Sequence, residues 1–453
     1  MFDRTLDSTT GPKRRIAVVG AGIAGLSAAW LLSRRHEVVL FETENRLGGH
    51  SCTVDAPSPD GSIAVDTGFI VYNEPNYPNF TALLDHLGVA SKAAHMSFAV
   101  SMNAGGFEYS SHGARGLFAQ KRNLASPRFW GMLMDLKRFH RTAAGDLAEL
   151  DRSLCSLGRY LDDHKYGDSF RDLHLLPQAA AIWSSTPRQM ADYPAAAFIR
   201  FYRNHRLLEV DMEPTWRTVA GGSRRYVEAL AADFQGDVRL NEPVSRIERG
   251  ADGATLHTRC GAERFDAVVL AVHSDQALAL LAEPGADERR LLQPMAYGRN
   301  RVVLHRDCSF MPRRRSAWAA WNYVGAGRAD AGGAASVTYW MNLLQGLSGP
   351  ELFVTLNPER EPDPALVLAD RDFDHPIFNA DAMLAQRGLG SLQGRNNTWF
   401  CGAWFGSGFH EDGLQAGLAV AEDIGGVRRP WSVPNESDRI PMPIPALEPL
   451  ADR

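Results

Sequence analysis

The spacing of apolar residues near the start of the chain predicts a strand, a helix and a second strand in succession. Residues 15–20 form a short apolar run that ends in glycine, and residues 21–32 carry small and apolar side chains at helical spacing. A second apolar run covers residues 37–42. Two strands joined by a helix within about 30 residues are typical of a β-α-β unit. Near the other end, a passage from residues 398–402 to residues 414–424 predicts a further strand followed by a helix.

The middle of the chain carries a different pattern. Residues 112–235 contain long apolar-periodic stretches interrupted by prolines, which predicts mostly helix. Residues 238–272 return to apolar runs that predict strands. Further strands are predicted at residues 301–306, 316–324, 335–343 and 352–356. Their succession favours an antiparallel sheet, so the pattern predicts an α/β chain in which other elements interrupt a parallel sheet.

Composition excludes several classes of protein. With 453 residues, 45% of them hydrophobic and 22% charged, the chain has the composition of a globular protein of two or three units. The net charge of -5 gives no overall attraction to nucleic acid, so no such partner is expected. Five scattered cysteines without a C-x-x-C pair argue against a disulfide framework or a metal site. The charged N-terminus and the absence of a long apolar run favour a cytoplasmic location.

Lysine is rare and is confined to the first part of the chain. Five of the 48 basic residues are lysines, and all of them lie at or before position 165. The sequence after Lys165 therefore excludes any mechanism that needs a lysine there, whether as a Schiff base, a proton shuttle or an anchor for water.

The turn between the first strand and the helix carries the pattern Gly-x-Gly-x-x-Gly, formed by Gly20, Gly22 and Gly25. Gly20 permits the tight turn, Gly22 lets the backbone approach a pyrophosphate, and Gly25 allows close packing of helix on strand. Ala24 lies within the motif and is assigned to the same site. Glu42 ends the second strand, where a carboxylate accepts hydrogen bonds from ribose hydroxyls. These residues predict a dinucleotide site and disfavour NADP, because an acid at this position fits a 2′-phosphate poorly.

The residues after Glu42 distinguish FAD from NAD. Arg46 is followed at once by the doublet Gly48-Gly49. A glycine doublet soon after the ribose-binding acid resembles the flavin amine-oxidase superfamily. The resemblance implies a bound FAD, with Arg46, Gly48 and Gly49 at its pyrophosphate and ribityl region.

Later motifs extend the resemblance over nearly the whole chain. It implies a second flavin-contact loop at residues 65–69, a strand beside the adenine at residues 243–247, and a closing motif at residues 401–417. The helix of the closing motif would direct its N-terminus at the flavin, where its dipole stabilises negative charge on the reduced ring. The residues implied at the cofactor in these motifs are Gly68, Phe69, Val244, Gly402, Gly413, Leu414 and Gln415.

The resemblance also implies a fold. The expected class is α/β, with a Rossmann-like FAD-binding domain and an inserted α+β substrate domain made of an antiparallel sheet plus helices. The FAD-binding domain is expected at residues 1–75, 215–295 and 390–428, the substrate domain at residues 76–214 and 296–389, and a proline-rich tail at residues 429–453. The tail is expected to be extended or disordered.

Amine oxidases of this superfamily typically place a lysine near the flavin, acting through a water. Residues 294–302 correspond to that stretch here and contain no lysine. Many amine oxidases also face the flavin with two aromatic rings that form a cage for the amine. Phe409 and Trp404 are the candidates for such rings, and the alternative is that both simply pack beside the cofactor.

The titratable residues His410, Glu411 and Asp412 precede the helix expected to meet the flavin. An imidazole near a carboxylate can donate or accept a proton, so His410 and Glu411 are the candidate catalytic residues. The structural alternative is that Glu411 and Asp412 cap the helix, which we favour for Asp412.

Residues 112–145 carry a charge opposite to that of the whole chain. They contain seven basic residues and one acid, Asp135, interleaved with aromatic, leucine and methionine side chains. This is the composition of an interfacial amphipathic helix on anionic lipid, so a peripheral membrane contact is expected here. The protein would then be membrane-associated. The alternative is an arginine-rich solvated face over an ordinary core.

A finer resemblance is to a bacterial branch of predicted NAD/FAD-binding proteins related to carotenoid-type desaturases and associated with fatty-acid modification. The matching stretches are residues 181–185, 216–224, 321–323 and 355–358. The resemblance implies an FAD-dependent oxidoreductase that desaturates, oxidises or isomerises an apolar, fatty-acyl or lipid-like substrate by hydride transfer to flavin N5. The alternatives are a lysine-independent flavin amine oxidase and a non-catalytic flavoprotein that assists a lipid-modifying enzyme.

Overall fold

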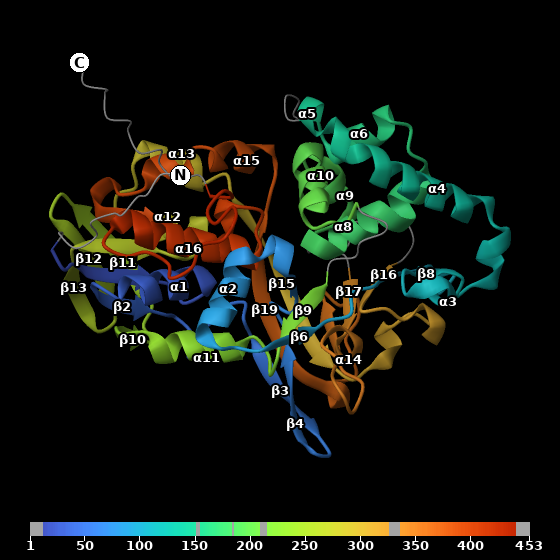
Figure 1. Cartoon of the computed structure of the whole chain (residues 1–453), viewed down its shortest axis with the longest axis horizontal. Coiled ribbons are helices and arrows are strands. Elements are labelled where there is room, and N and C mark those ends of the chain that lie inside the picture. The colour runs from blue at the N-terminus through green and yellow to red at the C-terminus, as the bar shows by residue number, and fades with distance from the viewer. Residues whose placement is uncertain (1–11, 151–154, 184, 209–214, 326–335, 441–453) are drawn as a thin grey trace.

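Segments from both ends of the chain form one parallel sheet (Figure 1). The computed structural model describes residues 12–150, 155–183, 185–208, 215–325 and 336–440, so the outermost parts of the expected first domain and tail lie outside it. In spatial order the strands are β10 (Asp237–Arg239), β2 (Glu37–Phe41), β1 (Arg15–Val19), β14 (Ala267–Leu270) and β20 (Thr398–Phe400). Every neighbouring pair is parallel, as the β-α-β pattern predicts.

Helix α1 (Ile23–Leu32) is apolar on all sides, and all ten of its residues are buried. A helix without a polar face must be covered all round. It packs against β1 and β2 and against the last helix, α16 (His410–Ile424). A Cβ added to Gly417 of α16 would lie 2.1 Å from the carbonyl oxygen of Ala24, so the two helices meet at backbone distance. The last helix thus covers the first β-α-β unit.

The region of residues 238–272 is a succession of strands, as predicted. Between β10 and β14 it forms an antiparallel meander of β11 (Val244–Gly250), β12 (Gly253–Thr258) and β13 (Gly261–Phe265). The meander lies outside the parallel sheet. Its first residue is Val244, one of the residues predicted to contact the cofactor.

A seven-stranded sheet forms the base of the second part of the molecule. Its strands in spatial order are β19 (Val367–Ile377), β15 (Ala296–His305), β18 (Phe353–Leu356), β17 (Ser336–Trp340), β16 (Trp321–Gly325), β7 (Phe98–Met102) and β8 (Phe107–Ser110). The predicted antiparallel sheet is wrong at one place, because β16 pairs with β7 in parallel. These two strands come from different insertions, so no hairpin joins them and nothing forces them to run in opposite directions.

Two predicted strands of this sheet are too long, and three of its strands, β7, β8 and β19, are not predicted. Trp321 begins β16, and α14 (Met341–Leu344) replaces the end of the run predicted at residues 335–343. The longest of the three, β19, lies at the sheet edge and pairs only with β15. Its exposed side chains include Asp370, Arg371 and Asp372, which interrupt the apolar pattern expected of a strand.

Helices gather at one side of the seven-stranded sheet, at the upper right of Figure 1. They are α3 (Gly113–Leu117), α4 (Pro127–Thr142), α5 (Leu147–Leu150), α6 (Leu157–Asp163), α7 (Asp168–Phe170), α8 (Leu176–Trp183), α9 (Pro187–Asp192) and α10 (Ala195–Asn204). Pro127 and Pro187 occupy the first turns of α4 and α9, where the missing N–H has no helical partner to lose. None of the described helices is long and apolar enough to cross a membrane.

Smaller elements connect the two parts. They are the hairpin β3 (Thr53–Ser58) and β4 (Gly61–Asp66), the small sheet of β5 (Tyr72–Asn73), β9 (Trp216–Val219) and β6 (Ser91–Ala93), and the helices α2 (Pro78–Leu87), α11 (Arg224–Asp233), α12 (Ser274–Leu280), α13 (Ala286–Leu292) and α15 (Ala380–Gln386). Helix α2 packs against both α11 and α16. It therefore links the first insertion to the end of the chain.

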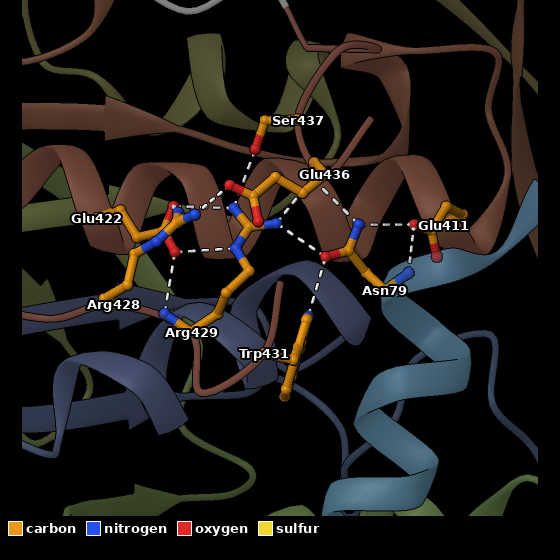
Figure 2. A network of polar contacts seen from close by, with 8 residues as sticks. All are labelled: Asn79, Glu411, Glu422, Arg428, Arg429, Trp431, Glu436 and Ser437. Carbon is orange, nitrogen blue, oxygen red and sulfur yellow. Dashed lines mark hydrogen bonds and ion pairs between the residues drawn. The ribbon is translucent and has the colours of Figure 1, made fainter. Parts of the chain in front are cut away.

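The described start of the proline-rich tail packs on the folded chain, so the expectation of an extended or disordered segment is wrong for residues 429–440 (Figure 2). The Arg429 side chain is fully buried, and its Nε and Nη2 donate to the two carboxylate oxygens of Glu422 at 2.8 and 2.9 Å. Its Nη1 donates to Asn79 Oδ1 of α2 at 2.9 Å. The Trp431 ring stacks on that of Trp30 in α1, with ring centroids 6.0 Å apart. Charge pairing and stacking hold this segment, which proline content alone does not reveal.

We expect Arg429→Ala to destabilise the protein far more than Arg428→Ala. Arg429 is buried against Glu422 and Asn79, and removing one partner of a buried ion pair costs about 3 kcal/mol. Arg428 binds the same carboxylate from a half-exposed position, which contributes less than about 1 kcal/mol. Urea unfolding of the two variants measures the difference. Equal effects would show that the tail does not stabilise the fold through Arg429.

Candidate functional site

One large cavity connects the parallel sheet with the helical part of the molecule. Its volume is about 1860 Å³, and its lining runs from the glycine turn after β1 to α4, α8 and α10. Pockets for single small molecules measure about 300–1,000 Å³. The cavity therefore has room for a dinucleotide and a second ligand.

The glycine turn forms one end of the cavity. Gly20 has a φ of +99°, and a Cβ on Gly25 would lie 1.8 Å from the carbonyl oxygen of Gly20. Gly25 thus serves the close packing of helix on strand and does not itself line the cavity. Gly22 does line it, and a Cβ added there would meet no protein atom within 4 Å. Open space against this backbone is what a bound phosphate group requires.

Glu42 follows β2 and turns back toward the glycine turn. One carboxylate oxygen accepts from the backbone N–H of Ala21 at 2.8 Å, and the other accepts from that of Glu44 at 2.9 Å. Both bonds fix the carboxylate at the cavity wall, which Glu42 lines. Each oxygen has a second lone pair, which can accept from a ribose hydroxyl.

The loop with the glycine doublet folds against the glycine turn. The N–H of Gly48 donates to the carbonyl of Ala21 at 2.8 Å, and Arg46 Nη2 donates to the carbonyl of Gly49 at 2.8 Å. A Cβ on Gly68 would lie 2.2 Å from the carbonyl of His50, so the second loop also approaches at backbone distance. The sequence motifs therefore form one continuous wall.

The start of α16 presents His410 to the cavity. Its ring stacks on Phe69 with centroids 3.8 Å apart, and its Nε2 hydrogen-bonds the hydroxyl of Tyr226 at 2.8 Å. Burial lowers the pKa of His410 to about 3, so the imidazole is neutral at neutral pH. The backbone N–H groups of this first turn give the cavity wall a partial positive charge, which favours an electron-rich ligand.

Glu411 lies away from the cavity, and the structure does not support its predicted catalytic role. Its carboxylate accepts from the backbone N–H groups of Asn79 and Phe80, both at 3.0 Å, and from Gln415 Nε2 at 3.0 Å. Glu411 therefore caps α2, because the first N–H groups of a helix lack helical partners. Asp412 accepts from the N–H of Phe409 at 2.9 Å, which is the capping role favoured for it.

The structure brings most of the predicted cofactor residues to the cavity and leaves a few behind it. Those that line the cavity are Gly20, Gly22, Ala24, Glu42, Arg46, Gly48, Gly49, Gly68, Phe69, Val244, Gly402 and Gly413. Leu414 and Gln415 are fully buried in α16 and do not line it. Their prediction as cofactor contacts is not supported, because only the first turn of the helix faces the cavity.

One buried polar atom supports a ligand between the two loops. His50 lines the cavity, and its buried Nε2 has no hydrogen-bond partner among the described residues. Burying an imidazole nitrogen without a partner is costly, so a bound group is expected to satisfy it. Together with the open space at Gly22, this fits a dinucleotide that extends from the glycine turn to the second loop.

The sequence did not predict His375, which a chain of hydrogen bonds holds in one tautomer. The backbone N–H of Arg301 donates to Asn357 Oδ1 at 3.0 Å, so Asn357 Nδ2 is the donor to Asn300 Oδ1 at 2.7 Å. Asn300 Nδ2 then donates to His375 Nδ1 at 3.0 Å. Nδ1 is therefore an acceptor, and Nε2 carries the hydrogen. His375 lines the cavity, and Asn300 lies in the stretch where the sequence lacks a lysine.

Phe409 and Trp404, the two rings predicted to face the flavin, both line the cavity, but each packs against a different partner. The Trp404 indole donates to the carbonyl of Val272 at 3.0 Å and packs on Phe405. Phe409 instead stacks on Phe201 of α10 with centroids 4.7 Å apart. Both of these rings line the cavity, so the helical insertion supplies a ring that the sequence around Phe409 cannot reveal.

Comparisons with known proteins agree with this architecture. The sequence model of flavin containing amine oxidoreductases matches residues 23–315. AofH of Mycobacterium tuberculosis, which carries the provisional name of a flavin-containing monoamine oxidase, is 29% identical over 285 residues. That alignment covers 59% of this chain and 59% of AofH. The chain thus matches about three fifths of the length of this relative.

Two further proteins are similar. A carotenoid phi-ring synthase of Streptomyces griseus is 28% identical over 307 residues, which cover 60% of this chain and 55% of that protein. The crystal structure of a fatty acid isomerase from P. acnes that produces CLA superposes with a TM-score of 0.62 at 17% identity. It covers 91% of this chain and 98% of the isomerase. This last likeness concerns the fold.

We expect Glu42→Gln to lower flavin affinity about 10-fold to 100-fold, because a lost hydrogen bond to a charged group costs about 1.5–3 kcal/mol. Titrating the apoprotein with FAD, followed by flavin fluorescence, measures the affinity. The control is Glu37→Gln at the start of the same strand, where the side chain is exposed and does not line the cavity. An unchanged affinity in Glu42→Gln would contradict a ribose contact.

We expect the protein to lose stability as the pH falls below about 6.5, the ordinary histidine pKa. Burial lowers the pKa of His174, His205 and His410 to about 3 each, so the unfolded chain binds protons that the folded chain does not. As the pH falls from the unfolded pKa of such a histidine toward its folded pKa, the free energy of unfolding decreases by about 1.4 kcal/mol per pH unit.

Urea unfolding at pH 7.0 and pH 5.5 measures this loss. His205→Phe keeps a ring against Phe201 and is expected to reduce the slope by about one proton. The control is His112→Asn, because His112 is exposed. If the free energy of unfolding of His205→Phe depends on pH as steeply as that of the unchanged protein, His205 is not held neutral.

Proposed function

Since the chain belongs to the family of flavin-containing amine oxidoreductases, we propose that it is an FAD-dependent oxidoreductase acting on an apolar, fatty-acyl or lipid-like substrate. The reaction would remove or relocate hydrogen at a C–H bond. Two similar proteins support this substrate class by name, the carotenoid phi-ring synthase and the fatty acid isomerase. The main support comes from the lining of the cavity beyond the cofactor wall.

The end of the cavity that α4, α8 and α10 line is called the helical end. It combines aliphatic side chains with positively charged ones. Its aliphatic lining residues are Leu133, Leu136, Ile182, Leu207 and Leu208. The charged residues that line this end, among those the structure describes, are the cations Lys137, Arg141 and Arg206. A protonated amine would meet charges of its own sign there, whereas a chain with an anionic head would find both an apolar wall and a counter-charge. This observation carries the proposal.

Bound FAD would supply the acceptor of a hydride, that is, of two electrons and one proton, from the substrate. The chain's own residues then hold and orient the two partners. Gly20, Gly22 and Glu42 would fix the dinucleotide at the glycine turn, and the stack of His410 on Phe69 closes the wall beside it.

His375 supplies a fixed hydrogen-bond donor within the cavity. Burial lowers its pKa to about 4, so its Nε2–H belongs to a neutral ring. We infer that this N–H orients an acceptor of the bound ligands, because Asn300 holds the Nδ1 side in place. A neutral donor can do so without adding charge to an apolar site.

A lysine-independent amine oxidase is the second candidate. AofH, the relative with an amine oxidase name, supports it, and so does the stacked pair Phe201 and Phe409, since aromatic faces bind cations. The cations at the helical end argue against it. The substrate panel below separates the two candidates.

We expect anaerobic mixing with detergent-dispersed fatty acids or acyl esters to bleach the flavin absorbance of the protein, and a panel of primary amines and polyamines to leave it unchanged. The apolar lining and the cations of the helical end are the physical reason. Stopped-flow absorbance measures the bleaching. Reduction by an amine but by none of the acyl compounds would overturn the proposal in favour of the second candidate.

A charge variant tests the same proposal from the protein side. Arg141→Glu is expected to raise the KM for an acyl substrate about 10-fold, because one charge at the cavity wall changes sign. The control is Arg259→Glu, an exposed arginine between β12 and β13 that does not line the cavity. Equal KM values for the two variants would show that the cations do not select the substrate.

A further inference from the structure

Large apolar side chains are rarely exposed on the described part of the chain, and they gather on one segment. Leu124, Trp130 and Met134 are three of the five that are exposed, with exposed fractions of 53%, 43% and 67%. The Trp130 indole donates to the carbonyl of Leu124 at 2.9 Å, which holds the two residues side by side. Scattered exposed apolar residues need no explanation, but a cluster marks an interaction site.

The exposed residues of α4 follow one face of the helix. Trp130, Met134, Lys137 and Arg141 are all exposed and are spaced by four, three and four residues, which places them on one stripe. The opposite face buries Phe129, Met132 and Phe139. We call Leu124 together with this stripe the docking face.

The surroundings of the docking face are strongly basic. The exposed cations of this segment are Arg115, Lys121, Arg122, Arg128, Lys137 and Arg141. Within the described ranges, no carboxylate forms an ion pair with any of the six. The one acid of the segment, Asp135, pairs with Arg138 at 2.8 Å. The cations are therefore available to an external anion.

The cavity reaches the surface at the same helix. Leu133, Leu136 and His140 line the cavity from the side of α4 next to the docking face. Lys137 and Arg141 belong to both, since they are exposed on the stripe and also line the cavity. A molecule bound at the docking face would therefore lie beside the mouth of the cavity.

We propose that the docking face binds the surface of an anionic phospholipid bilayer, from which an acyl chain enters the cavity between Lys137 and Arg141. Tryptophan, leucine and methionine side chains partition into the boundary between headgroups and acyl chains, while surrounding cations attract anionic headgroups. A soluble polyanion would use the cations but would gain nothing from the apolar residues. The binding step rests on the surface alone, and the entry of the chain rests on the proposed function.

Vesicle flotation of the full-length holoprotein tests the binding. We expect it to float with vesicles of phosphatidylcholine and phosphatidylglycerol in equal parts, and to float much less with phosphatidylcholine alone or at high salt. Met134→Glu is expected to weaken this binding about 10-fold, because it removes an inserted side chain and adds a repelled charge. Leu384→Glu on α15 is the matched control, because Leu384 is also exposed, at 46%, and lies on another element.

The outcomes separate this inference from the proposed function. Met134 does not line the cavity, so Met134→Glu is expected to turn over detergent-dispersed substrate at the unchanged rate. Equal vesicle binding by Met134→Glu and Leu384→Glu would overturn the docking face, as would binding to heparin without binding to vesicles. Vesicle binding without flavin reduction and without an isomerised product from any acyl compound would support docking and overturn the proposed function. Flavin reduction without vesicle binding would support the proposed function and overturn the docking face.

Discussion

The close approach of backbone on both sides of α1 is the constraint on which the rest of the structure depends. A Cβ on Gly25 would lie 1.8 Å from the carbonyl of Gly20, and a Cβ on Gly417 would lie 2.1 Å from the carbonyl of Ala24. The first contact sets α1 against the glycine turn, and the second sets α16 against α1. The last helix must therefore return to the first one, and the chain between them contributes four more strands to the central sheet and two long insertions outside it.

The two insertions explain where the cavity lies. The segments inserted between β2 and β10 and between β14 and β20 lie to one side of the parallel sheet and build the seven-stranded sheet there. Strands β7 and β16 belong to different insertions, so no hairpin forces them to run in opposite directions, and they pair in parallel. The cavity lies where the second sheet and its helices meet the glycine-rich loops, so each of its ligands would contact residues from distant parts of the sequence.

Local patterns could be predicted from the sequence, whereas contacts between distant segments could not. The glycine turn, Glu42 and the doublet of Gly48 and Gly49 are local patterns, and the structure places all of them at the cavity. Glu411 was mistaken for a catalytic candidate because its partners, the N–H groups at the start of α2, lie far away in sequence. His375 was missed because edge strand β19 has no apolar period, and the ordered start of the tail was missed because burial of Arg429 depends on tertiary contacts.

The distribution of charge in the cavity would give a substrate of the proposed class a direction. Burial keeps His205, His375 and His410 neutral by lowering their pKa values to about 3–4, so these residues offer hydrogen bonds without net charge. Lys137 and Arg141 are exposed basic residues that line the cavity at α4. An amphiphile satisfies both regions in one orientation only, with its head at α4 and its chain directed inward. This orientation would rest on the exposed basic residues of α4 and on the aliphatic side chains that line the same end of the cavity.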